Sequence, residues 1–154
     1  MAGAFSRALN YLTARSRTVK ETTDYLLRKG FSPEETGQAV ARLLELDLLN
    51  DKKTAVQWVE YCMRCKPRGR DRLSRELLSR GVDRAIIEET LEMLDEDAEF
   101  ELAMQLLSPR PVSQWPENKL YRFLRYRGFS FPIIERVKLY YENRVNPRKN
   151  LTEE

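Results

Sequence analysis

One short segment, residues 64–75, carries the densest set of side chains able to bind an anion. Its sequence, RCKPRGRDRLSR, contains a single acid, Asp71, and six basic residues: Arg64, Lys66, Arg68, Arg70, Arg72 and Arg75. Arginine can hold a phosphate or a carboxylate through two parallel N–H groups. Pro67 and Gly69 keep the backbone open between these side chains. We therefore expect this segment to contact a polyanion, and a solvated surface is the simpler alternative.

A second basic stretch is interleaved with aromatic residues. In ENKLYRFLRYRGF, which begins at residue 117, the basic side chains are Lys119, Arg122, Arg125 and Arg127, with Arg136 further along. The first three recur every three residues and so share one face of a helix. Such a stripe can follow a nucleic-acid backbone. A solvated face is the alternative for the basic residues, and core packing is the alternative for the aromatic ones: Tyr121, Phe123, Tyr126 and Phe129.

The residue types argue against catalysis and against a metal centre. The chain contains no histidine, which is the commonest general base and metal ligand, and it has no glycine-rich phosphate loop or nucleophile motif. Cys62 and Cys65 form a C-x-x-C motif without the second pair that a zinc site needs. We expect Cys62 in the core and Cys65 as a free thiol. The sequence therefore predicts a binding protein without a cofactor, one that contacts phosphates or an acidic protein rather than reading base sequence.

Charge is unevenly distributed along the chain. The net charge is only +3, yet residues 85–109 hold eight acids and no lysine or arginine. One region could attract polyanions while the next repels them, although a solvated helix face explains the acidic run equally well. No apolar run approaches the roughly 18 residues of a membrane span, and the N-terminus lacks the features of a secretory signal. We expect a cytoplasmic protein without a membrane partner.

Three glycines mark turns that would position the basic side chains. Gly30, Gly81 and Gly128 stand in the similar stretches RKGFSPEE, SRGVDRAI and YRGFSFPI. Glycine often ends a helix because it adopts the left-handed conformation at low cost. The next helix would begin just beyond each glycine. Capping-box spacing predicts a further helix start at the pair Thr18–Glu21 and supports the start just beyond Gly30 at the pair Ser32–Glu35.

The spacing of these glycines indicates a repeat. They lie 51 (81−30) and 47 (128−81) residues apart, enough for three helices per repeat. Amphipathic patterns predict a leading helix in each repeat, at residues 4–14, 52–65 and 96–107. We expect an all-α fold, an elongated and curved array of three helix-turn-helix-like repeats. Its parts would be residues 1–51, 52–97 and 98–145, followed by a flexible tail at 146–154, with residues 108–118 as the longest loop.

The central sequence resembles the RecX family of bacterial recombination regulators. The stretch LLNDKKTAVQWVEYCMRCKPRGRDRLSRELLSRGVD matches that family's signature at Leu48, Leu49, Asp51, Ala55, Trp58, Lys66, Arg68, Gly69, Glu76, Leu77, Arg80 and Gly81. The stretches ALNYLTARSRTVKETTDYLLRKGF and NKLYRFLRYRGF resemble its N-terminal and C-terminal repeats. The resemblance extends from about Ala8 to Tyr141. Two positions depart from the family pattern, because Asp47 stands where glycine is common and Thr54 where an aromatic residue is common.

This resemblance implies a protein that binds the RecA recombinase, chiefly as its filament on single-stranded DNA. It implies inhibition of filament extension, strand exchange, ATP hydrolysis and co-protease activity, and hence a role in DNA repair, homologous recombination and the SOS response. Direct binding of single-stranded DNA, and of double-stranded DNA as an open possibility, is also implied. We expect a monomer whose two basic stretches contact DNA or RecA. The alternatives are a stand-alone helix-turn-helix-type DNA-binding regulator and a scaffold that binds protein through apolar surface.

Overall fold

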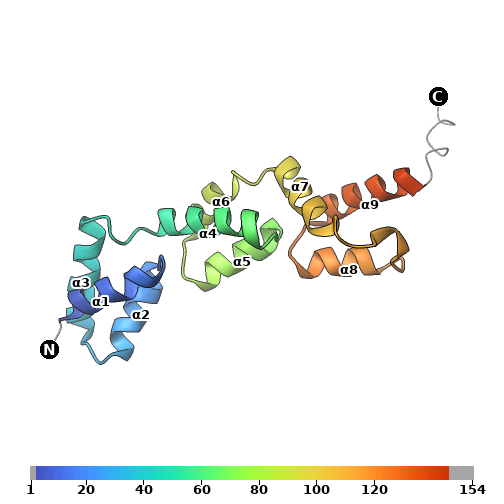
Figure 1. Ribbon diagram of the computed structural model, residues 1–154. Helices are drawn as coiled ribbons and strands as arrows, with labels where there is room; N and C mark the ends of the chain where they lie inside the picture. Colours follow the sequence, from blue (N-terminus) through green and yellow to red (C-terminus); the bar gives the residue numbers. More distant parts are fainter. Residues whose placement is uncertain (1–2, 146–154) are drawn as a thin grey trace. The chain divides into compact units, whose positions relative to one another are not determined.

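The structure, a computed structural model, describes residues 3–145, and this part of the chain is helical throughout. It contains nine α-helices, one short 3-10 helix and no strand (Figure 1). The elements are α1 (Ala4–Ala14), α2 (Val19–Arg28), α3 (Pro33–Glu45), α4 (Asp51–Cys65), α5 (Arg70–Ser79), α6 (Arg84–Leu91), α7 (Glu96–Leu107), η1 (Val112–Gln114), α8 (Lys119–Tyr126) and α9 (Phe131–Val145). The expected all-α class and the three leading helices are confirmed. The expected tail at 146–154 lies outside the described residues.

Two compact units divide the chain, and their boundary falls inside helices. Unit 1 combines the residues up to Glu60 with Glu76–Thr90, and unit 2 combines Tyr61–Arg75 with the residues from Leu91 onward. Helices α4 and α5 each contribute to both units. The units therefore do not coincide with three consecutive repeats. The division at residues 51, 97 and 145, and the elongated shape, remain predictions.

Local sequence explains where the helices of unit 1 begin. Both predicted capping boxes are present: the hydroxyl of Thr18 accepts from the backbone N–H of Glu21, and that of Ser32 accepts from Glu35. In each box the glutamate carboxylate accepts from the backbone N–H of the capping residue. These contacts satisfy N–H groups that have no partner within the helix. Pro33 begins α3, where its missing N–H costs nothing.

Glycine allows the chain to turn after α2, α5 and α8. Gly30, Gly81 and Gly128 have φ angles of 93°, 88° and 87°, in the left-handed region that other residues rarely adopt. The leucine four residues before each glycine is fully buried, at Leu26, Leu77 and Leu124. Asp47 also has a positive φ, 55°. This conformation explains why glycine suits that position, and Asp47 adopts it while accepting a hydrogen bond from Asn50.

Each unit buries apolar faces of its own helices. In unit 1 the main cluster consists of Ala8, Leu26, Ala39, Val40, Leu43 and Leu49. In unit 2 the buried apolar residues of α7, α8 and α9 include Leu102, Ala103, Leu107, Leu124, Ile133, Ile134 and Val137. Phe129 is fully buried, which is the core-packing alternative for this residue, and Cys62 is buried while Cys65 is exposed, as expected. No helix in the described range is both long and apolar enough to cross a membrane.

Candidate functional site

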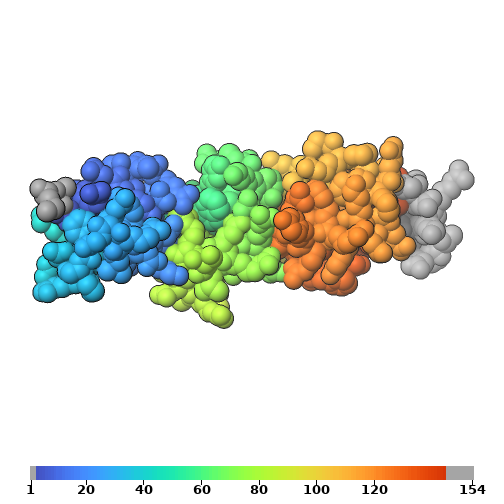
Figure 2. Space-filling model, turned by 90° about the horizontal axis from the view of Figure 1, so that it is seen from below, coloured from blue at the N-terminus to red at the C-terminus, as the bar shows by residue number. Residues whose placement is uncertain are grey.

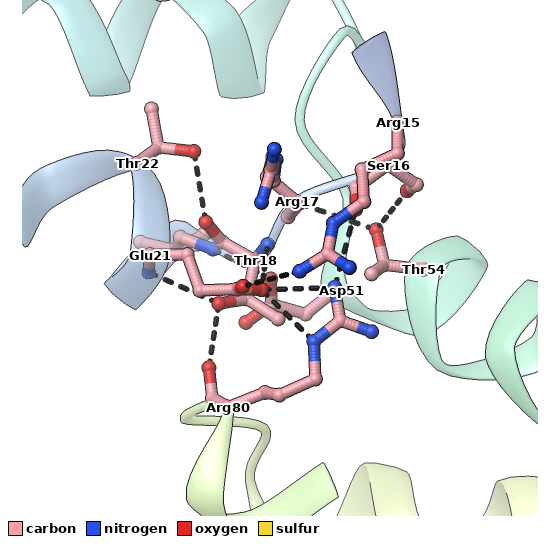
Figure 3. Close-up of polar contacts among 10 residues, drawn as sticks. Arg15, Ser16, Arg17, Thr18, Glu21, Thr22, Asp51, Thr54 and Arg80 are labelled. Carbon is pink, nitrogen blue, oxygen red and sulfur yellow. Dashed lines mark hydrogen bonds and ion pairs between the residues drawn. The ribbon is translucent and has the colours of Figure 1, made fainter. Parts of the chain in front are cut away.

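Polar groups from α2, from α4 and from the turn after α5 meet at the N-terminus of α2 in unit 1 (Figure 3). Arg80, the first residue after α5, donates from Nε to Glu21 Oε1 at 3.0 Å and from Nη2 to the Ser16 carbonyl at 3.1 Å. The carbonyl of Arg80 accepts from the Thr18 hydroxyl at 2.6 Å. Asp51, the first residue of α4, accepts from the N–H of Val19 at 2.8 Å. The network therefore joins α2, α4 and the turn after α5.

The pKa values of the two carboxylates in this network are shifted in opposite directions. Burial raises the pKa of Glu21, but the Thr18 N–H and the Arg80 guanidinium outweigh it, so the pKa lies below its ordinary value. Burial raises the pKa of Asp51, and the nearby carboxylates Asp83 and Glu21 add to the rise despite the hydrogen bond from Val19. These shifts follow from desolvation and charge pairing inside a packed junction. The network has the features of a structural contact rather than a ligand site.

Unit 2 contains a comparable junction, built from backbone. The N–H of Gly69 donates to the Arg127 carbonyl at 2.9 Å, and the N–H of Asp71 donates to the Gly128 carbonyl at 3.1 Å. A Cβ on Gly69 would lie 2.3 Å from the Gly128 carbonyl carbon, so no other residue fits without backbone movement. Arg125 on α8 adds an ion pair to Asp71 at 2.7 Å. The start of α5 is thereby held against the turn between α8 and α9.

Arg70, one of the basic residues of segment 64–75, forms hydrogen bonds inside unit 2. Its Nη1 donates to the carbonyls of Leu91 and Leu94 at 3.0 and 2.7 Å, and its N–H donates to Glu99 Oε1 at 3.2 Å. Glu99 is 1% exposed. Burial raises the pKa of Glu99, although N–H groups of Arg70 and Ser130 favour its charged form. Arg70 therefore stabilises unit 2, because its guanidinium adds hydrogen bonds to the carbonyl at the end of α6, which also accepts from the Leu94 N–H, and to the carbonyl of Leu94 just beyond it.

The other predicted basic residues have varied surroundings. Arg64, Lys66, Arg75, Lys119, Arg122 and Arg125 are exposed, whereas Arg68, Arg72 and Arg127 are half-buried. Three of the exposed ones have polar contacts within the protein. Arg75 Nε donates to the Asp71 carbonyl at 3.3 Å, Arg122 Nε donates to the Asn118 carbonyl at 3.4 Å, and Arg125 pairs with Asp71. Arg136 pairs with Asp97 at 2.8 Å. Arg64 and Lys66 remain as candidates for external contact, and Arg122 is a further candidate through its exposed terminal nitrogens, since only its Nε bonds to its own helix.

Seven residues of unit 2 form what we call the arginine–aromatic cluster: Arg72, Arg110, Trp115, Lys119, Phe123, Tyr126 and Arg127. The guanidinium carbons of Arg127 and Arg110 lie 3.7 and 5.0 Å from the centre of the Phe123 ring. The Trp115 ring lies 5.1 Å from the Phe123 ring. Lys119 Nζ lies 4.7 Å above Trp115, and the guanidinium of Arg72 lies 5.7 Å from the Tyr126 ring. The surface of α8 and of the loop before it is amber to orange in Figure 2.

The cations of this cluster repel one another. Partial burial lowers the pKa of Arg127, and the positive charges of Arg110 and Arg72 lower it further. Within residues 3–145, neither Arg110 nor Arg127 forms an ion pair with a carboxylate; the polar contacts of their side chains are with the carbonyls of Leu106 and Phe123. The cluster therefore presents positive charge that an external anion can neutralise.

Comparison with known proteins decides the family. The RecX first three-helix domain matches residues 4–43, and the RecX second three-helix domain matches residues 50–91. A regulatory protein RecX of Caldanaerobacter subterraneus is 35% identical over 135 residues, which are 87% of this chain and 68% of the relative. The chain belongs to the RecX family.

Other RecX proteins support the same assignment. Regulatory protein RecX of Bacillus subtilis is 31% identical over 94% of this chain, and the chain spans 58% of that relative's length. The crystal structure of RecX from Lactobacillus salivarius superposes with a TM-score of 0.80 at 28% identity, covering 90% of this chain and 94% of that one. A second RecX crystal structure, 23% identical, shares the fold with a TM-score of 0.77.

The RecX signature quoted from the sequence has a packing explanation in this structure. Leu49 and Leu77 are buried, whereas Leu48 is 50% exposed. Asp51 caps α2, and Gly69 allows the close backbone approach in unit 2. Trp58 Nε1 donates to Glu76 Oε2 at 3.1 Å. Apart from Leu48, the signature residues named in this paragraph therefore lie in the core or at junctions between helices.

Sequence reasoning missed two members of the arginine–aromatic cluster. Arg110 and Trp115 lie in the segment 108–118, which its three prolines mark only as a loop. One signal was available, because Trp115 precedes Lys119 by four residues and stands just before the basic helix. The loop itself contains η1, which seats Val112 in the core of unit 2.

Proposed function

We propose that this protein regulates RecA: it binds RecA and its filament on single-stranded DNA, and it inhibits filament extension, strand exchange, ATP hydrolysis and co-protease activity. The observation that carries the proposal is the 35% identity to a regulatory protein RecX over 87% of this chain. In this proposal the protein acts in the cytoplasm, as a monomer and without a cofactor. Its action is binding rather than catalysis.

The charged surfaces of the described residues support a nucleoprotein partner. Arg64, Lys66 and Arg122 are exposed basic side chains, and the arginine–aromatic cluster adds cations without paired carboxylates at Arg110 and Arg127. Exposed basic side chains attract polyanions, and this attraction weakens as salt screens the charges. A RecA–DNA filament offers phosphates and acidic protein side chains together, so it is the partner that this surface fits best.

A titration of the RecA ATPase tests the proposal. We expect ATP hydrolysis by RecA on single-stranded DNA to fall as this protein is added, and more steeply at low salt. The double variant Arg64→Glu with Lys66→Glu should inhibit less, because both side chains are exposed and change sign.

The matched control is the double variant Arg28→Glu with Arg84→Glu. It alters the net charge by the same amount, at exposed positions of α2 and α6. Equal loss of inhibition in both variants would remove the assignment to segment 64–75. Undiminished ATP hydrolysis at saturating wild-type protein would reject the function. Tight, sequence-selective binding of duplex DNA without RecA would favour a stand-alone DNA-binding regulator instead.

A further inference from the structure

We propose that the arginine–aromatic cluster of unit 2 binds single-stranded nucleic acid, with a base stacked on Tyr126 and phosphates held by Arg110, Lys119 and Arg127. This inference rests on the proposed function. It goes further by assigning this surface to the nucleic acid rather than to RecA, and by naming an aromatic side chain as part of the contact.

Charge alone makes the cluster unusual for a purely structural feature. Two other arginines of unit 2 have acidic partners, Arg125 with Asp71 and Arg136 with Asp97. Arg110 and Arg127 instead lie against the same ring, that of Phe123, with no ion pair in the described part of the chain. Like charges this close destabilise each other, and phosphates would relieve that repulsion.

The aromatic residues distinguish a nucleic acid from an acidic protein. Tyr126 is 76% exposed, the largest exposed fraction among the large hydrophobic and aromatic side chains of residues 3–145. An acidic protein surface would gain little from this ring, whereas an unpaired base can stack on it. Arg72 lies beside the ring, and Arg127 follows Tyr126 in sequence. A stacked base would therefore have its phosphate next to guanidinium groups.

The guanidinium groups are also oriented before any ligand arrives. Arg127 Nη1 donates to the Phe123 carbonyl at 3.4 Å while the group lies on the Phe123 ring. Arg110 Nη1 donates to the Leu106 carbonyl. Each group thus keeps other N–H donors for a phosphate, and less side-chain entropy is lost when the phosphate binds. Duplex DNA keeps its bases stacked within the helix, so a single strand fits this surface better.

The first test is fluorescence anisotropy with a labelled oligothymidylate of about 15 nucleotides and an abasic oligomer of equal length. We expect Tyr126→Ala to weaken oligothymidylate binding about five-fold or more, the loss of one stacked base. The abasic oligomer should bind both proteins about equally. Tyr126→Phe keeps the ring and should restore the affinity. An unchanged affinity of Tyr126→Ala for oligothymidylate would overturn the stacking contact.

The second test concerns the phosphates. Lys119→Gln with Arg127→Gln should weaken both oligomers and reduce the slope of log affinity against log salt by about 1.4, the value for two phosphate contacts on a single strand. Arg28→Gln with Arg84→Gln removes the same charge from unit 1 and should leave the slope nearly unchanged. Equal effects of the two double variants would reject the cluster as the phosphate site.

A cross-linking experiment locates the contact without a destabilising substitution. An oligonucleotide carrying 5-iododeoxyuridine, irradiated with the wild-type protein, should cross-link to Tyr126 or Trp115 when the peptides are identified by mass spectrometry. Cross-links confined to other aromatic residues would overturn the proposal. The RecA ATPase titration decides the proposed function separately, because a protein that binds the oligomer through Tyr126 without inhibiting RecA would keep this site and lose that function.

Discussion

At Glu21 two neighbours outweigh the effect of burial. The Thr18 N–H and the Arg80 guanidinium both stabilise the carboxylate, and the side chains of Arg80 and Glu21 are only 17% and 19% exposed. An ion pair this sheltered, with hydrogen bonds at both ends, contributes more than an exposed one. The contrast within unit 1 is Lys52–Glu89, whose side chains are 59% and 56% exposed.

We predict that Arg80→Met lowers the free energy of unfolding at neutral pH by about 1.5–3 kcal/mol, the range for hydrogen bonds to charged groups. Because the pKa of Glu21 is lowered in the folded state, its contribution is complete above the unfolded value near 4.5 and is lost as pH falls through the folded pKa. The difference between wild type and variant should therefore shrink on acidification. Urea unfolding at several pH values measures it.

The control is Lys52→Met, which removes the exposed ion pair with Glu89 and should cost about 0.5 kcal/mol or less. If the two variants proved equally destabilising, the junction at α2 would lack the importance that its geometry indicates.

Among the elements, the turns between helices carry the contacts that hold each unit together. The turn after α5 packs on the start of α2, where a Cβ on Gly81 would lie 2.5 Å from the Cβ of Lys20. The turn after α8 packs on the start of α5, where Gly69 and Gly128 are in contact. A Cβ on Gly30 would meet no atom within 4 Å, so the turn after α2 lies in open space. Two of these three glycine turns thus pack on the start of another helix.

We predict that Gly69→Ala destabilises the protein by about 1–3 kcal/mol, because the added methyl group meets backbone rather than a movable side chain. Gly37→Ala is the matched control, since a Cβ there meets nothing within 4 Å inside α3. It should stabilise the protein by about 0.5–1 kcal/mol through helix propensity. Thermal and urea unfolding of both variants check the opposite signs, and a neutral Gly69→Ala would contradict the close approach.

Local sequence signals were enough to predict the helices. They did not predict the contacts between residues that are far apart in the sequence. The capping boxes at Thr18 and Ser32 act within one turn, so their spacing alone locates α2 and α3. The inward direction of Arg70 depends on carbonyls more than twenty residues away, at Leu91 and Leu94. The pairing of Arg110 with Phe123 depends on how a loop folds back on α8. No periodicity in the sequence encodes either contact.

For the whole molecule, the boundary inside α4 and α5 has a consequence for fragments. The RecX first and second three-helix domains together end at residue 91. Residues 61–75, however, belong to the compact unit that contains the residues from Leu91 onward. Their partners, including Leu94 and Glu99, would be missing from a fragment that stops there.

We predict that a fragment of residues 1–91 keeps unit 1 folded and loses order at residues 61–75. Amide hydrogen exchange should show slow exchange in α2 and α3 and fast exchange from Tyr61 to Arg75, because few buried contacts remain there. The chain of 154 residues is the control. Equal protection of residues 61–75 in both proteins would show that the second three-helix domain folds without unit 2.

The boundaries between the two compact units fall inside helices rather than in loops. Dividing the gene at a loop would therefore separate segments that pack in the same unit. An insertion between α3 and α4 falls within unit 1, between the α2 start and the Asp51 that contacts it, and the long connection before α8 likewise joins segments of a single unit. Growth at the C-terminal side by a further helical triplet would need only a new glycine turn able to seat on the start of α8.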